Sequence, residues 1–464
     1  MRLLPASPEI GPNTGFDPKI DIFERKVFGI GLGNLLSNVE DPLVLVLDSQ
    51  WGSGKTTFTK MWAGYLREQR FPVIYFDAFA NDFMSDAFTA IAGEVLSIAN
   101  ETLGKDKASY QKYLENAIGA GKVLLRSDIK IGAKAATLGA LSDKDLGELQ
   151  AITEDVANEA ADITDAYLKE HLEKHTEQKL SIENFRTSLS SLAKGMGAQI
   201  DPQEEGSKKA SKPLIFIIDE LDRCKPTFAL SLLESIKHFF AVQGVHFVLV
   251  THLKQLENCV RYSYGPEIDA STYLQKFYNI SVSFPYIDEN RSDVKKYLSH
   301  LEKNIPATGN SAQLKSALIH KIGIIAERNA LSLRTVERVI SCVSLMLAYT
   351  GERNLRLQPL IAGLCVLKVC KPELYEKAAK GRLRYKDIQL FLGLEELAKY
   401  DGKNKVPIQE RDAHWWVYCL EPDFENYNVD WTDYTRPLYQ YSVERERLVP
   451  FTASSIIDRF TFGQ

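Results

Sequence analysis

Residues 43–62 read LVLVLDSQWGSGKTTFTKMW, and this stretch decides the fold. Six mostly aliphatic residues, 43–48, predict a buried strand, and the pattern from about residue 54 to 68 predicts a helix. The turn between them matches the phosphate-binding motif G-x-x-x-x-G-K-[ST] except at its first position, where Ser49 stands instead of glycine. A serine at this position raises the conformational energy of the loop only if its φ must be positive.

The turn carries the residue types that a phosphate site needs. Gly52 and Gly54 permit a tight turn that aims several backbone N–H groups at one point, and a helix N-terminus behind them favours an anion. Lys55 can reach terminal phosphates, and the Thr56 hydroxyl can hold magnesium. The alternative is a chance Gly-Lys-Thr in an ordinary strand–helix turn. Trp51 is expected to pack in the core beneath the loop, with stacking near a nucleotide as its alternative.

A second apolar strand ends in carboxylates in LIFIIDELDRC, residues 214–224. Asp219 at its end is placed to fix magnesium through water, and Glu220 to orient and deprotonate an attacking water as general base. The alternative is that both residues only cap the next turn. Lys55 and Asp219 lie much further apart in sequence than one βα unit spans, so the sequence predicts an insertion between them.

Strands alternating with helices predict an α/β fold, with a parallel sheet wrapped by helices, a large helical insertion and a C-terminal helical domain. Further elements are expected as helices at 21–36, 84–103 and 226–240 and as strands at 72–79 and 245–252. The predicted regions are a flexible N-terminal arm (1–20), a nucleotide-binding core (21–103 and 211–290), a mainly helical insertion (104–210), a helical lid domain (291–400) and an aromatic-rich C-terminal subdomain (401–464).

Composition narrows the class of protein. A net charge of −5 and a pI near 6.0 exclude a global basic field for nucleic acid or anionic lipid. Six cysteines lack paired metal-ligand spacing, which favours thiols in a reducing cytoplasm. The first residues lack the apolar core of a signal peptide. Since no run of about 20 apolar residues occurs, we expect a cytoplasmic protein; the segment 122–141 is at most an amphipathic, surface-touching one.

The C-terminal region is rich in aromatic residues mixed with acids. Base-stacking surfaces need rings interleaved with Lys or Arg, so the neighbouring carboxylates favour a packed subdomain or a protein-docking surface over nucleic acid. The best basic cluster, KGRLRYK at 380–386, is explained by a solvated helix end. Nucleic acid binding stays open.

Four segments, spread over about residues 20–345, resemble the KAP-type P-loop NTPases. They are DSQWGSGKTTF (48–58), FIIDELDRCKPTFALSLLESIKHFF (216–240), YGPEIDASTYLQKFYNISVSFP (264–285) and LSLRTVERVI (331–340). The chain departs from the family at Ser49, at His252, where relatives often carry aspartate, and in lacking the paired transmembrane helices that many relatives carry in the insertion.

The resemblance implies the additional-strand, catalytic-glutamate division of P-loop ATPases, with ATP and Mg²⁺ as cofactors. It implies Asp219 and Thr56 on the metal and Glu220 as base. Arg223 becomes a candidate phosphate-sensing or finger arginine, with a salt bridge to Asp222 or Glu220 as the alternative. Arg334 becomes a candidate sensor from the lid. The nucleotide-binding residues are then Trp51, Gly52, Ser53, Gly54, Lys55, Thr56 and Thr57.

These expectations favour an ATPase that acts as a nucleotide-driven switch or assembly factor. The likeness to a family that includes phage-exclusion proteins implies anti-phage defence with protein partners, or a homo-oligomer formed through the helical and aromatic-rich regions. Two alternatives stay open. One is a nucleotide-dependent scaffold with little hydrolysis, and the other is a nucleic-acid-stimulated ATPase motor.

Overall fold

The chain divides into two compact units in the computed structural model, and each is described by itself. The first comprises Glu9–Gln50 and Lys55–Pro285; the second comprises mainly Tyr286–Gln464, and the loop residues Trp51–Gly54 are grouped with it. The structure describes residues 8–84, 86–104, 107–126, 157–200, 212–285, 293–304, 310–350, 354–394, 408–427, 429, 431–439, 441 and 443–458. Most of the expected amphipathic segment 122–141 and the linker-like residues 201–211 lie outside them.

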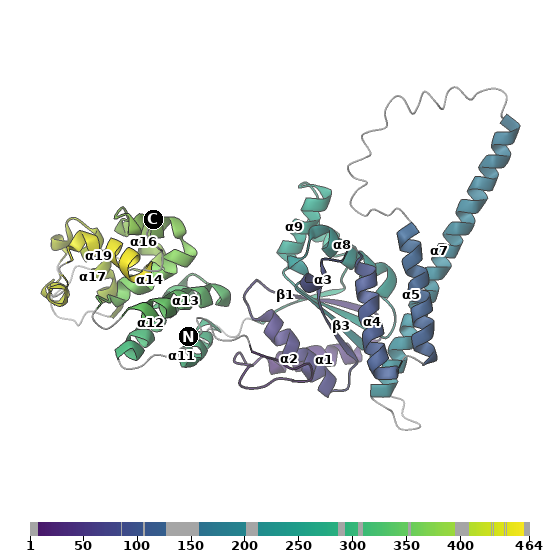
Figure 1. The fold of residues 1–464 in the computed structure, drawn as a ribbon, viewed down its shortest axis with the longest axis horizontal. Helices are drawn as coiled ribbons and strands as arrows, with labels where there is room; N and C mark the ends of the chain where they lie inside the picture. The colour runs from purple at the N-terminus through teal and green to yellow at the C-terminus, as the bar shows by residue number, and fades with distance from the viewer. Residues whose placement is uncertain are drawn as a thin grey trace. The chain divides into compact units, whose positions relative to one another are not determined.

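A five-stranded parallel sheet forms the centre of the first unit (Figure 1). Its spatial order is β2-β3-β4-β1-β5. The strand before the glycine turn, β1, is therefore separated from the acid-bearing strand β3 by β4. The bounds are β1 Leu43–Asp48, β2 Val73–Asp77, β3 Leu214–Asp219, β4 Val245–Thr251 and β5 Ile280–Ser283.

Alternate residues of the inner strands enter two separate apolar cores, because successive side chains of a strand point to opposite faces. On β1, Leu43, Leu45 and Leu47 face one core while Val44 and Val46 face the other. Both faces are therefore covered, as a parallel sheet requires. The first core contains α1 (Lys26–Asn38) and α2 (Lys55–Glu68), whose buried residues include Leu36 and Trp62.

The helices on the second face surround a cluster of phenylalanines: Phe88, Phe185, Phe216, Phe239, Phe240 and Phe247. The remaining helices of this unit are α3 Ala78–Asn81, α4 Ala87–Leu103, α5 Ala108–Arg126, α7 Ala157–Ile200, α8 Pro226–Ser235 with the π-helical η3 Ile236–Phe240, α9 Leu253–Tyr264 and α10 Ala270–Leu274. The short 3-10 turn η2, Leu221–Arg223, follows β3.

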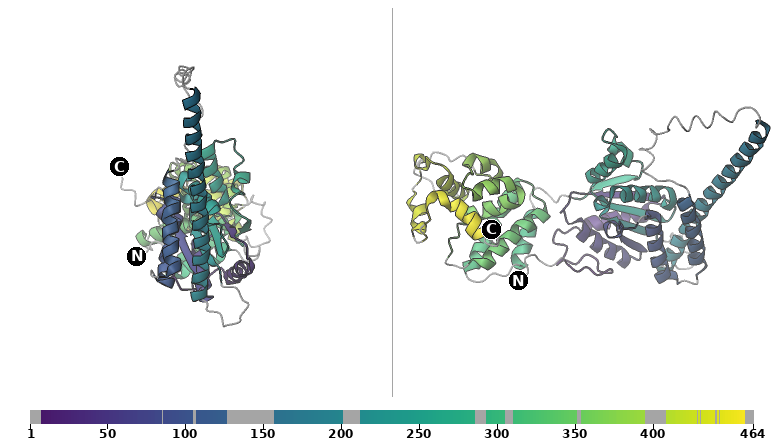
Figure 2. Two further views of the ribbon diagram at one scale, coloured as in Figure 1. Left: turned by 90° about the vertical axis from the view of Figure 1, so that its right-hand side faces the viewer. Right: turned by 45° about the horizontal axis from the view of Figure 1, so that its top comes forward.

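The insertion between β2 and β3 is helical where the structure describes it. Helices α5 and α7 run side by side against α4, and the first part of the 44-residue helix α7 extends beyond them as a straight rod (Figure 2). The Asn116 amide donates to the Asn184 carbonyl, which ties α5 to α7. None of the described helices is long and apolar enough to cross a membrane.

Residues 12–16, which belong to the predicted flexible arm, lie against α2. Phe16 packs on Phe58 and Tyr65 with ring centroids 5.7 and 5.9 Å apart. The Arg67 guanidinium donates to the Pro12 carbonyl at 2.6 Å. The adjoining helix, expected at 21–36, instead begins at Lys26, because the Asp21 carboxylate accepts the backbone N–H groups of residues 25 and 26 in a turn.

The second unit is helical and has one apolar core running from Leu298 to Ile457. Helix α14 lies at its centre, since it is apolar on all sides and buries Leu360–Ala362 and Leu364–Leu367. Described aromatic residues of the C-terminal region, such as Trp416 and Tyr418, pack into this same core. The bounds are α11 Asp293–Asn304, α12 Asn310–Arg328, α13 Leu333–Tyr349, α14 Gln358–Cys370, α15 Pro372–Ala379, α16 Tyr385–Leu392, α17 Ile408–Leu420, η4 Phe424–Asn426, α18 Thr432–Thr435, η5 Arg436–Leu438, η6 Arg445–Arg447, α19 Leu448–Phe451 and η7 Thr452–Ile457.

A buried histidine joins β4 to the end of α1. The backbone N–H of Leu43 donates to His246 Nδ1 at 3.2 Å, so Nε2 carries the proton and donates to the Val39 carbonyl at 3.1 Å. The imidazole is 1% exposed, and its burial lowers the pKa of His246. A protonated imidazole would lose the bond from Leu43, so the fold requires the neutral ring.

We predict that His246 makes the fold sensitive to mild acid. Because its pKa is lower in the folded than in the unfolded chain, the stabilisation is complete above about pH 6.5 and is lost as the pH falls below that value. Each unit of pKa depression contributes about 1.4 kcal/mol. Denaturant titrations from pH 8 to 5 should show a steeper loss of the free energy of unfolding for wild type than for His246→Gln. The exposed His238→Gln variant is the control, and equal slopes for all three proteins would contradict the assignment.

Candidate functional site

The carboxyl ends of β1, β2 and β3 bring acidic side chains to one edge of the sheet. Asp77 is the register partner of Asp219 across β2 and β3, and Asp48 is the partner of Thr251 across β1 and β4. Parallel strands place their carboxyl ends together, and such edges are where ligands bind in open α/β sheets. The glycine turn begins at this same edge, directly after Asp48.

The backbone of the turn explains its glycines. Gly52 and Gly54 have φ of 78° and 83°, in a region that residues other than glycine rarely adopt. Ser49 has a negative φ, so its replacement of the first motif glycine carries no backbone strain. Helix α2 begins at Lys55, directly after Gly54, which puts unpaired N–H groups of its first turn at the end of the loop.

Lys55 is buried beneath the loop, with 9% of its surface exposed. Its ammonium donates to the Ser49 carbonyl at 2.5 Å. Burial lowers the pKa of Lys55, while the carboxylates of Asp222, Asp219 and Asp48 act in the opposite direction. A lysine held this way is surrounded by negative charge and has one backbone partner inside the loop itself.

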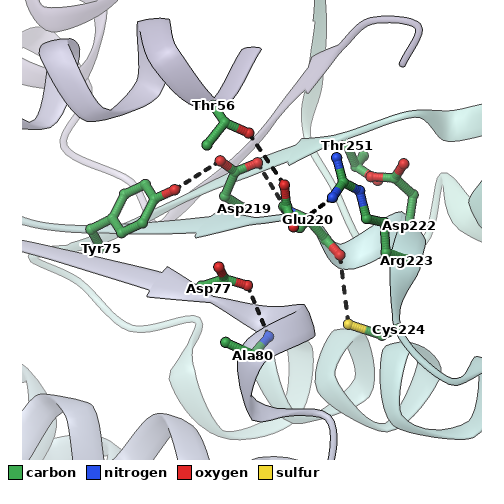
Figure 3. Close-up of polar contacts among 10 residues, drawn as sticks. All are labelled: Thr56, Tyr75, Asp77, Ala80, Asp219, Glu220, Asp222, Arg223, Cys224 and Thr251. Carbon is green, nitrogen blue, oxygen red and sulfur yellow. Dashed lines mark hydrogen bonds and ion pairs between the residues drawn. The ribbon is translucent and has the colours of Figure 1, made fainter. Parts of the chain in front are cut away.

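Donors on different elements surround the Asp219 carboxylate (Figure 3). The Tyr75 hydroxyl on β2 donates to Oδ2 at 2.9 Å, and the backbone N–H of Glu220 donates to Oδ1 at 2.8 Å. The Thr56 hydroxyl also interacts with this carboxylate. Asp219 is 1% exposed; its burial raises the pKa of the carboxyl group, and the hydrogen bonds and Lys55 oppose that shift.

Glu220 lies beside Asp219 in an unusual backbone conformation. Its φ and ψ are 61° and 25°, which lie in the left-handed region that residues other than glycine normally avoid. Its carboxylate pairs with Arg223 at 3.0 Å and lies 3.5 Å from the Thr56 hydroxyl. Burial raises the pKa of Glu220, and Arg223 opposes the shift. The strained turn thus directs the carboxylate toward the start of α2 (Figure 3).

Asp222 links the turn after β3 to the neighbouring strand β4. The fully buried Thr251 donates to Asp222 Oδ1 at 3.2 Å. Asp48, at the end of β1, accepts the backbone N–H of Leu253 at 2.9 Å and so fixes the start of α9. These contacts connect the carboxyl ends of β1, β3 and β4 along one edge of the sheet.

This edge fits a magnesium–nucleotide pair better than a preformed metal centre. In the described part of the chain, no three His, Cys, Asp or Glu side chains form a chelating group. Mg²⁺ usually keeps several waters and takes one or two protein oxygens together with substrate phosphates. The Asp219 carboxylate and the Thr56 hydroxyl offer such oxygens side by side, at the start of a helix that favours phosphate.

Comparison with protein families agrees with this geometry. A model of the KAP family P-loop domain matches residues 30–350. The chain belongs to the KAP family of P-loop NTPases. No curated protein matches the chain. The family match covers the whole sheet and extends to the end of α13, so the KAP domain includes the phosphate loop, the insertion and the first helices of the second unit.

The predicted site residues of the KAP domain are brought together only in part. Lys55, Thr56, Asp219 and Glu220 meet at one sheet edge. The salt bridge considered for Arg223 is present, with Glu220 as partner. Arg334 lies on α13 of the second unit with an exposed side chain, and its action on a nucleotide stays a prediction.

The loop itself differs from expectation at one residue. The prediction that Trp51 packs in the core beneath the loop is wrong, because 43% of its side chain is exposed. Ser53 and Thr57 are half-buried. Nucleotide binding by Trp51, Ser53 and Thr57, as by the other residues of the loop, stays a prediction.

Three polar residues of the KAP site were not foreseen from the sequence. Tyr75 and Asp77 belong to the stretch PVIYFDAF, where alternate residues at 75 and 77 share a face of β2. Asp77 also ends an apolar strand, as Asp219 does, and this pattern could have indicated it. Asp222 gives no such signal, since its role depends on the fold of the turn after β3.

We predict that the left-handed backbone at Glu220 costs measurable stability. Glu220→Ala and Glu220→Gly both remove the carboxylate and its pair with Arg223, but only glycine adopts this φ without strain. The glycine variant should be the more stable of the two by about 0.5–1 kcal/mol in free energy of unfolding, measured with urea. An alanine variant as stable as the glycine variant would show that the turn relaxes.

Proposed function

We propose that this KAP domain binds ATP with magnesium and hydrolyses it, and that the nucleotide cycle switches the protein between states. The observation that carries the proposal is the convergence of Lys55, Thr56, Asp219 and Glu220 at the carboxyl edge of the sheet. A lysine, a hydroxyl, a metal-binding carboxylate and a second carboxylate are the parts that phosphoryl transfer to water requires.

Each group has a chemical task in this proposal. The loop N–H groups and the N-terminus of α2 hold the phosphates, and Lys55 neutralises charge on them. Thr56 and Asp219 would hold magnesium, which supplies a further positive charge at the phosphate oxygens. Glu220 takes the proton of the attacking water. Its burial helps, because a carboxylate whose pKa is raised is a better base.

The pairing of Glu220 with Arg223 favours one alternative. A base held in an ion pair at 3.0 Å is less free to accept a proton, so the scaffold reading, in which ATP binds and is hardly hydrolysed, has an observation on its side. The switch proposal requires that Arg223 leaves Glu220 when nucleotide binds, as a phosphate-sensing arginine would. No contact of the described residues favours the nucleic-acid-stimulated motor over these two.

The biological role belongs to the same proposal. The family resemblance supports anti-phage defence, with hydrolysis driving assembly or signalling through a partner protein or further copies of the chain. Arg334 would act on the nucleotide from the helical unit. Partner binding through the helical and aromatic-rich regions is proposed on their size and composition.

Lys55→Ala should lose tight ATP binding, because the loop then lacks the cation that faces the phosphates. We expect the dissociation constant for ATP to rise about 100-fold or more, on the order of two charged hydrogen bonds. Equilibrium binding of a fluorescent ATP analogue measures it. The exposed Lys60→Ala on the same helix is the matched control. Unchanged affinity in Lys55→Ala would defeat the site assignment.

Glu220→Gln should retain ATP and lose turnover. The amide keeps the shape of the side chain but cannot take a proton, and loss of a general base typically lowers the rate about 10²- to 10⁴-fold. Phosphate release and ATP affinity are measured on the same preparation. A wild-type rate as low as that of the variant, with ATP bound in both, would support the scaffold instead of the switch.

A further inference from the structure

The hydroxyl of Tyr75 lies against the carboxylate that the proposed function assigns to magnesium. It donates to Asp219 Oδ2 at 2.9 Å from the neighbouring strand (Figure 3). Tyr75 is the register partner of Ile217, two residues before Asp219 on the same face of β3, so the phenol reaches diagonally across the strand pair. Tyr75 lies two residues before the end of β2, and from there the long tyrosine side chain reaches the Asp219 carboxylate at the end of β3.

Packing alone does not account for a tyrosine at this position. The ring lies at the margin of the core shared with α1 and α2, and Lys60 lies over it at 5.9 Å from the ring centroid. A phenylalanine would fill the same space, as Phe76 does on the opposite face of β2. What tyrosine adds is a hydroxyl, and that hydroxyl contacts Asp219.

Two hydrogen bonds hold the Asp219 carboxylate from two sides. Tyr75 occupies one lone pair of Oδ2, and the Glu220 N–H occupies one lone pair of Oδ1. Each carboxylate oxygen has two such sites, so one on each oxygen is left for the Thr56 hydroxyl and for a metal-bound water. Fixing both oxygens stops rotation of the carboxylate group, as partners beyond the direct ligands do at metal sites.

We propose that Tyr75 is a positioning residue for magnesium, which sets the orientation of Asp219 through its phenolic hydrogen bond. The inference rests on the proposed function, since it concerns the metal that accompanies ATP. Without the hydroxyl, the buried carboxylate loses a donor and its orientation, while the phosphate loop keeps all its groups. The effect therefore falls on the metal-dependent part of nucleotide binding.

The test compares ATP affinity in excess Mg²⁺ with ATP affinity in EDTA, measured by titration calorimetry on the full chain. Tyr75→Phe should reduce the gain in affinity due to Mg²⁺ about tenfold, the usual effect of one hydrogen bond to a charged group, and leave the affinity in EDTA unchanged. Tyr65→Phe, which removes a hydroxyl from a half-buried tyrosine of α2, should match wild type.

A double-mutant cycle with Asp219→Asn separates positioning from a general loss of stability. If Tyr75 acts through the carboxylate, Tyr75→Phe should change the Mg²⁺ dependence much less in the Asp219→Asn background than in wild type. A purely destabilising effect appears in both backgrounds and cancels. An equal effect in both, or an unchanged Mg²⁺ gain in the single variant, overturns the inference. Wild type that binds no ATP overturns the proposed function itself.

Discussion

Parallel hydrogen bonding between β2, β3, β4 and β1 aligns the last residues of these strands, and the site depends on that alignment. Asp77 on β2 is the register partner of Asp219 on β3. Asp48 on β1 is likewise the register partner of Thr251 on β4. A slip of one residue between β3 and β4 would turn Asp219 to the other face of the sheet, away from Thr56. Such a slip would also exchange the side chains that enter the two cores, and closely packed cores do not tolerate that exchange.

Burial of charge is the second constraint on the same edge. Lys55 and Asp219 are both largely removed from water, so each loses hydration that nearby opposite charges and donors replace only in part. Carboxylates outnumber cations among the residues that act on Lys55, since Asp48, Asp219 and Asp222 oppose Arg223 there. A nucleoside triphosphate adds further negative charge to this edge, and a divalent cation at Asp219 would offset part of it, which ties metal and nucleotide binding to each other.

Local sequence patterns predicted the fold class and the meeting of Lys55, Asp219 and Glu220 at one sheet edge. The inner strands are specified by six or seven mostly apolar residues each, and the positive φ values of Gly52 and Gly54 explain the motif glycines. β5 was missed because it is only four residues long and mostly exposed at the sheet edge, so it lacks the apolar run of the inner strands. Trp51 was misplaced because exposure of a loop side chain depends on surroundings that the motif does not encode.

The same sequence patterns could not predict contacts between residues that are distant in sequence or whose partner is chosen by the fold of a turn. The partner of Arg223 could be either of two nearby acids in sequence, and only the left-handed turn at Glu220 selects that residue. The bond from Tyr75 to Asp219 joins residues 144 positions apart, on either side of the helical insertion. The family match identifies the P-loop domain and gives no information on such pairs.

The outer strand β5 has a consequence for how the folded chain behaves in a crowded solution. It is four residues long, and the exposed Ser281 and Ser283 alternate with apolar neighbours. A strand with unpaired backbone groups on one side can pair with a strand of another molecule. This tendency to pair decreases as the edge strand becomes shorter and more polar. Ending the sheet in this way lets the chain keep a sheet apolar on both faces while discouraging edge-to-edge aggregation.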